Sequence, residues 1–137
     1  FWQDNQNLPQ VASWRGFSFE GVCFYHELQI KKALGINGVQ TELYPWKSRT
    51  EKEGAQIDMI IDRADNVMNI CEMKFSDDEY IITAKYDKEL RHKLTVLREE
   101  SGTKKALHLT LVTTYGLRMN EYSGIVQKVI TMDDFFG

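Results

Sequence analysis

The chain has 137 residues, a formal net charge of −3 at pH 7, 42% hydrophobic residues and 27% charged residues. These values predict one soluble globular domain with a real core, and the negative charge argues against a protein that coats nucleic acid without specificity. The sequence has no apolar run of membrane-spanning length, no signal peptide, no P-loop and no zinc spacing, and its two cysteines, Cys23 and Cys71, are predicted to be buried free thiols of a cytoplasmic protein.

The first segments are a lead-in and a long helix. Residues 1–13 are rich in Asn, Gln and Asp and contain Pro9, which predicts a linker, and residues 14–137 are predicted to form the folded domain. The chain begins with Phe1 rather than Met, so we expect a piece of a longer protein. Helical spacing of apolar residues predicts a heavily buried helix that ends at Gly35. Its apolar positions are Phe17, Phe19, Val22, Cys23, Phe24, Tyr25, Leu28, Ile30 and Leu34.

Glu20 lies among these apolar residues and has two interpretations. An acid near the start of a helix is stabilised by the helix dipole. Alternatively, Glu20 is a third acid directed at the same site as Asp58. The residues alone leave both open.

Residues 39–46 predict a first strand that ends near Pro45, because proline cannot donate to a strand ladder. The charged connection that follows, residues 47–53, is predicted to be a solvated loop. The same connection could approach a phosphate backbone through Lys47, Arg49 and Lys52.

A β-hairpin is predicted at the centre of the chain. Two apolar runs, residues 54–62 and 67–74, flank the turn-forming residues 63–66. If pairing is symmetric about Asp65, Asp58 lies opposite Glu72. Alternation predicts one face with Asp58, Ile60, Ile70, Glu72 and Lys74, and another with Ile57, Met59, Ile61, Cys71 and Met73. Both faces are largely apolar, so we expect the hairpin inside a sheet covered on two sides.

Asp58 and Glu72 carry the chemistry of this hairpin. Directly opposed carboxylates repel, and a divalent cation such as Mg²⁺ would compensate. Lys74 points to the same place, so the three residues predict a metal-dependent phosphodiesterase site. The alternative is a weak ion pair on a strand face, and spacing alone decides nothing further.

A second helix is predicted after Thr83, a suitable N-cap, with an apolar stripe that ends near Gly102. The stripe consists of Tyr86, Leu90, Leu94 and Leu97. Its charged faces are predicted to be solvated, with phosphate contact by Lys85 or Lys88 as the alternative. Strands at residues 106–114 and 125–132 complete an α/β order, which predicts a mixed central sheet flanked by helices.

This order, with Asp58 on one strand and Glu72-Met73-Lys74 on the next, resembles the PD-(D/E)xK nuclease superfamily. The resemblance implies a restriction-endonuclease-like αβββαβ core that binds Mg²⁺ or Mn²⁺ through its acids. Glu20 matches the additional acid that many members carry on the first helix. The proline that names the motif is replaced here by Ile57.

Four stretches look like the C-terminal nuclease-like domain of a bacterial AAA-type ATPase family: residues 14–20, 54–58, 71–74 and 113–116. This likeness implies an N-terminal ATPase domain in the same full-length chain and DNA as the polymer partner. It covers nearly the whole sequence.

The two resemblances imply a set of roles. Asp58, Glu72 and the main-chain carbonyl of Met73 would bind the metal, Lys74 would orient the attacking water, and Glu20 would hold a second metal or a metal-bound water. The expected reaction is hydrolysis of DNA phosphodiesters. The alternative is a catalytically inactive nuclease-fold module that serves the ATPase as an interaction or regulatory domain.

Overall fold

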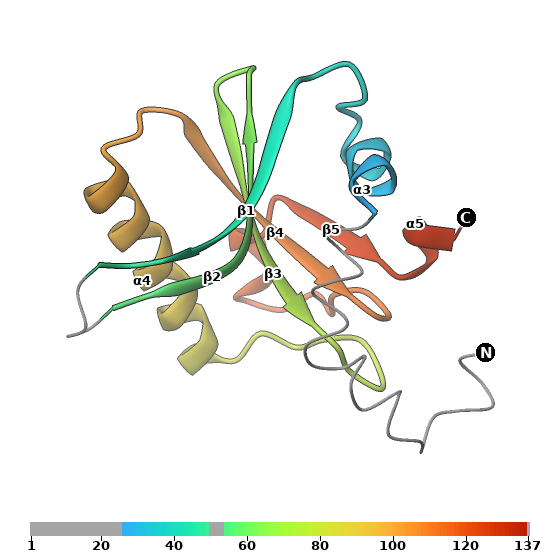
Figure 1. Ribbon diagram of the computed structural model, residues 1–137. Helices are drawn as coiled ribbons and strands as arrows, with labels where there is room; N and C mark the ends of the chain where they lie inside the picture. The colour runs from blue at the N-terminus through green and yellow to red at the C-terminus, as the bar shows by residue number, and fades with distance from the viewer. Residues whose placement is uncertain (1–25, 50–53, 137) are drawn as a thin grey trace, which may run out of the picture.

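The computed structural model describes residues 26–49 and 54–136. Its elements follow the predicted order of helix, three strands, helix and two strands (Figure 1). They are α3 (Glu27–Leu34), β1 (Thr41–Lys47), β2 (Gln56–Arg63), β3 (Val67–Lys74), α4 (Ala84–Ser101), β4 (Ala106–Thr113), a 3-10 helix (Ser123–Ile125), β5 (Lys128–Thr131) and α5 (Asp133–Phe136).

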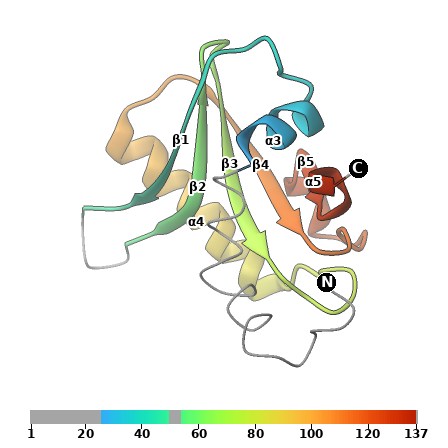
Figure 2. The same cartoon turned by 45° about the vertical axis from the view of Figure 1, so that its right-hand side comes forward.

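The strands form one mixed sheet in the order β1-β2-β3-β4-β5. The pairs β1/β2 and β2/β3 are antiparallel, and β3/β4 and β4/β5 are parallel. Helix α4 covers one face of the sheet, while α3 and α5 lie on the other (Figures 1 and 2). The predicted α/β architecture with a restriction-endonuclease-like αβββαβ core is therefore confirmed.

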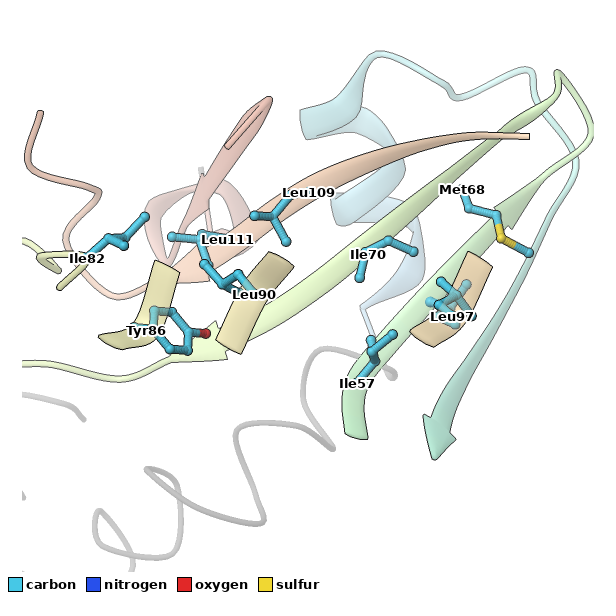
Figure 3. Close-up of a cluster of buried hydrophobic side chains, with 10 residues drawn as sticks. Ile57, Met68, Ile70, Ile82, Tyr86, Leu90, Leu97, Leu109 and Leu111 are labelled. Atoms are coloured by element: carbon cyan, nitrogen blue, oxygen red, sulfur yellow. The ribbon is translucent and has the colours of Figure 1, made fainter. Parts of the chain in front are cut away.

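Each face of the sheet has its own hydrophobic core. The α3-side core contains Ile30, Ile36, Met59, Ile61, Cys71, Met73, Val112, Ile130 and Met132. The α4-side core, drawn in Figure 3, contains Ile57, Ile60, Met68, Ile70, Ile82, Tyr86, Leu90, Leu97, Leu109 and Leu111. The two-sided cover explains why the central strands are apolar on both faces.

The predicted register of the central hairpin is confirmed. Met59 pairs with Cys71 and Ile60 pairs with Ile70, which is the symmetric pairing about Asp65. Asn66 in the turn has φ 68°, a left-handed conformation that asparagine tolerates better than most residues.

A β-bulge in β2 breaks the alternation that the sequence predicts. Tyr44 pairs with Ile60 and Trp46 with Ile57, so Pro45 alone lies opposite Asp58 and Met59. Ile57 therefore joins the α4-side core, and its predicted place on the other face is wrong. The predicted strand end near Pro45 is also two residues too early, since β1 continues to Lys47. As an edge strand, β1 accommodates a proline that has no N–H to donate.

Helix α3 ends where the sequence predicts, but one residue predicted to be buried on it is exposed. Gly35 terminates α3 in a left-handed conformation with φ 73°. Ile30 is fully buried, whereas Leu28, predicted to be buried, is 78% exposed. Two residues correspond to about 200° around a helix, so Leu28 points away from the face that Ile30 buries. The predicted helical residues 17–25 and the lead-in 1–13 lie outside the described residues.

Helix α4 has the predicted boundaries and the predicted stripe. The Thr83 hydroxyl caps it by accepting a hydrogen bond from the N–H of Tyr86 at 3.1 Å. Tyr86, Leu90 and Leu97 are buried, and Leu94 packs against the same core. The last predicted strand, 125–132, is shorter than expected: the 3-10 helix includes Ile125, and β5 runs only from Lys128 to Thr131.

Gly102 ends α4 with φ 67°, and no atom would lie within 4 Å of a Cβ added there. We expect Gly102→Ala to lower the free energy of unfolding by about 1 kcal/mol, because only the backbone conformation opposes a side chain. Urea denaturation followed by circular dichroism measures it. Gly38→Ala is the control, since Gly38 has equal space and no left-handed φ. Equal losses in the two variants would contradict the prediction.

Cys71 is buried, as predicted, and its thiol lies 3.9 Å from the main-chain carbonyl oxygen of Asn69, while Cys23 lies outside the described residues. Among the helices of residues 26–49 and 54–136, none has the length and apolar character needed to cross a membrane.

Candidate active site at the fork of the central hairpin

The two central strands separate at the predicted site. Pairing between β2 and β3 ends at Met59 and Cys71. Beyond that pair, β2 remains with β1 as far as Gln56, and β3 remains with β4 as far as Lys74. Figures 1 and 2 show β1 and β2 bending away from β3 here. The next residues after the last pair are Asp58 and Glu72, so both acids lie at the fork.

The two carboxylates cross-link the fork. Asp58 Oδ2 accepts a hydrogen bond from the main-chain N–H of Met73 at 2.9 Å. Glu72 Oε2 accepts one from the main-chain N–H of Asp58 at 3.3 Å. Side-chain oxygens, rather than main-chain carbonyls, accept these two N–H groups. The bulge at Asp58 re-aims its side chain toward β3, which is a usual role of bulges beside functional sites.

Glu72 is the most deeply buried member of the site, with 1% of its surface exposed. Lys93 Nζ, from α4, donates to its Oε1 at 2.5 Å, and the hydroxyl of Tyr86 lies 3.5 Å from the same oxygen. Burial raises the pKa of Glu72, the charge of Asp58 raises it further, and Lys93 opposes both effects. The charged form of Glu72 therefore depends on cations nearby.

Lys74 contacts Tyr86, which is itself next to Glu72. Its Nζ lies 4.5 Å from the centroid of the Tyr86 ring, a cation–π contact. Burial, and then the charge of Glu72, raise the pKa of Tyr86, so its hydroxyl stays protonated at physiological pH. Tyr86 thus contacts Lys74 with its ring and Glu72 with its hydroxyl.

A shallow hollow opens beside Asp58. It has a volume of about 150 Å³ and is lined by Pro45, Trp46, Lys47, Gln56, Ile57 and Asp58. The Asp58 side chain is half-buried and Lys47 is exposed. The hollow gives a small ion access to Asp58, with a basic residue on its rim.

Of the residues predicted to contact nucleic acid, the structure brings Lys47 to the hollow. The main-chain N–H of Arg49 donates to Glu100 Oε1 on α4 at 2.8 Å, so Arg49 lies near the end of that helix. Lys85 and Lys88 are exposed on α4 and do not line the hollow. Lys52 lies outside the described residues.

The donor set fits a hard divalent cation. Mg²⁺ and Mn²⁺ accept one or two carboxylates together with water, and two adjacent carboxylates occur here. The charge of Asp58 raises the pKa of Glu72, so a further cation would stabilise the ionised pair. Within residues 26–49 and 54–136, no group of three His, Cys, Asp or Glu side chains is close enough to hold a metal. Glu20 lies outside these ranges, and its role stays a prediction.

Sequence reasoning did not identify Lys93 or Tyr86 as site residues. The apolar stripe predicts Tyr86 as a core residue only, and Lys93 lies on one of the charged faces that the sequence predicts to be solvated. A signal was present, since Lys93 follows Leu90 by three residues and precedes Leu97 by four, and both leucines are buried. A lysine at such a position needs an acidic partner across the core.

Comparison with known proteins adds information about the fold alone. No family model matches the sequence, and no curated protein matches it. The structure is similar to the crystal structure of AF1548, a protein of unknown function, with a TM-score of 0.50 and 14% identity. The similarity covers 77% of this chain and 56% of AF1548, so the chain spans little more than half of that protein.

Proposed function

We propose that this domain is a metal-dependent nuclease of the PD-(D/E)xK type that hydrolyses DNA phosphodiesters with Mg²⁺ or Mn²⁺. The observation that carries the proposal is the meeting of Asp58 and Glu72 at the fork of β2 and β3, beside the hollow. Lys74 lies two residues beyond Glu72 and contacts the same tyrosine. The site and the αβββαβ core support the proposal together.

Each residue of the site would have its own role. Asp58 and Glu72 would hold the ion, with the main-chain carbonyl of Met73 as a neutral ligand. When bound, the ion supplies a Lewis acid and lowers the pKa of its water. Lys74 would orient that water and stabilise charge on the phosphate. Lys47, exposed on the rim of the hollow, would contact a phosphate of the substrate.

The proposal also includes a cytoplasmic location and an N-terminal ATPase domain in the full-length chain. The resemblance of four stretches to the C-terminal nuclease-like domain of AAA-type ATPases supports the ATPase domain. A second candidate is a catalytically inactive interaction module. One observation favours it: Lys93 forms an ion pair with Glu72, so this buried acid has a counter-ion without a metal ion.

The proposal is tested by titrating Mg²⁺ and Mn²⁺ calorimetrically into the protein and into Asp58→Asn. Plasmid and single-stranded DNA are incubated with each metal in parallel. We expect Asp58→Asn to abolish measurable metal binding and to slow cleavage by roughly 100-fold or more, the scale of losing one stabilising group in an active site. Asp62→Asn is the control, because Asp62 lies on the same strand and pairs with Lys105 instead.

The possible outcomes separate the candidates. Cleavage that persists in Asp58→Asn contradicts the proposed site. Metal binding that depends on Asp58 without cleavage of either DNA favours the interaction module. Equal loss of binding in Asp62→Asn would show that the effect is not specific to the fork.

A further inference from the structure

Lys93 forms an ion pair with Glu72, one of the two acids proposed to hold the metal ion. Its Nζ lies 2.5 Å from Glu72 Oε1, and the side chain of Lys93 is 20% exposed, while that of Glu72 is 1% exposed. The other oxygen, Oε2, accepts the N–H of Asp58. Both oxygens of Glu72 are therefore engaged by groups of the protein itself.

An ammonium group and a divalent cation at the same oxygen would repel each other strongly, because little water separates them in a buried site. We infer that Lys93 is a built-in counter-ion that gates the site: Mg²⁺ binds at Glu72 only when Lys93 Nζ leaves Oε1. This inference rests on the proposed function, since it concerns how the same site takes up its metal.

The structure allows this exchange. Lys93 lies on α4, outside the sheet that holds Asp58 and Glu72, so its amine can leave without disturbing the fork. A lysine amine sits on a flexible four-carbon stem, and the partly exposed side chain has solvent beside it. Lys74 has a different position, over the ring of Tyr86, and does not occupy an oxygen of Glu72 in this structure.

A matched control exists at the other end of the sheet. Lys105 Nζ lies 2.5 Å from Asp62 Oδ1, the same kind of pair at the same distance. Lys105 also donates to the main-chain carbonyl of Arg63 at 2.8 Å, away from the fork. Removing either lysine changes the net charge by the same amount, so a difference between the two variants reports position and not total charge.

The experiment is calorimetric titration of Mg²⁺ at one pH and ionic strength into the wild-type protein, Lys93→Met and Lys105→Met. We expect the Kd of Lys93→Met for Mg²⁺ to fall roughly tenfold or more, because the competing charge is absent. Lys105→Met should stay within about twofold of the wild type. Lys93→Gln keeps a polar end and serves as a second variant if the methionine variant does not fold.

A second readout follows the amine directly. In the wild-type protein with isotopically labelled lysine, NMR signals of the Lys93 side chain should shift on addition of Mg²⁺, and those of Lys105 should not. Mg²⁺ binding by the wild type that is unchanged or weaker in both Lys93 variants overturns the gate and leaves the proposed nuclease intact. If neither the wild type nor either Lys93 variant binds Mg²⁺, and the same titrations with Mn²⁺ also show no binding, both the gate and the proposed nuclease are overturned. Lys93 is then the permanent partner of Glu72 in an inactive site.

Discussion

Replacing Leu90 with alanine is expected to lower the free energy of unfolding by about 2–5 kcal/mol. Leu90 is fully buried in the α4-side core, between α4 and the sheet (Figure 3). The loss combines the transfer of the missing methyl and methylene groups with the cavity that they leave. Because a domain of this size has a total stability of roughly 5–15 kcal/mol, the variant would lose a large part of it. Urea denaturation measures the change.

Leu28→Ala is the control for this prediction. Leu28 lies on α3 and is 78% exposed, so its removal should change the free energy of unfolding by less than about 0.5 kcal/mol. If both variants lost the same amount, α4 would contribute no more packing energy than an exposed surface, which contradicts the two-sided core.

The double variant Glu72→Gln/Lys93→Met is expected to be more stable than the wild type by about 1–4 kcal/mol in the presence of a chelator, and to bind no Mg²⁺. A buried ion pair is often less favourable than a neutral pair of similar volume, because both charges lose their hydration. Glutamine keeps an oxygen that can accept the N–H of Asp58. If the double variant is more stable and no longer binds Mg²⁺, Glu72 is present for metal binding and not for stability.

The pH dependence of the free energy of unfolding gives a second measure of how the Glu72–Lys93 pair contributes to stability. Burial and Asp58 raise the pKa of Glu72 above its ordinary value of 4.5. Between 4.5 and that raised pKa, the folded chain holds a proton that the unfolded chain has released. The unfolded state thus binds fewer protons, so this contribution to stability falls as the pH rises through the window. The double variant should lack that fall, and urea denaturation from pH 4 upward measures it.

The control for the double variant is Asp62→Asn/Lys105→Met. Its ion pair is partly exposed, with 28% and 29% of the two side chains accessible, and such pairs contribute at most about 1 kcal/mol. A Glu72/Lys93 double variant that is less stable than the wild type, while the control is unchanged, would make the buried pair a structural one.

Local signals were sufficient for most of the fold. The turn residues and the apolar runs beside them determine the hairpin and its symmetric register, and that register places Asp58 near Glu72. The Thr83 cap, the left-handed glycines and the stripe along α4 are also local, because each depends on residues within a few positions of one another. These interactions act over one turn or one strand, so the sequence by itself specifies them.

Only the tertiary structure decided which side chains surround Asp58 and Glu72 at the candidate site. The bulge at Asp58 depends on how β1 pairs with β2, and it moved Ile57 to the opposite face from the one that alternation predicts. The partner of Glu72 comes from α4, 21 residues further along the chain. Whether a charge pattern on a helix is solvated or reaches a buried acid depends on where that helix docks. The packing of α4 on the sheet therefore determines that Lys93, on a helix face that the sequence predicts to be solvated, lies inside the candidate site.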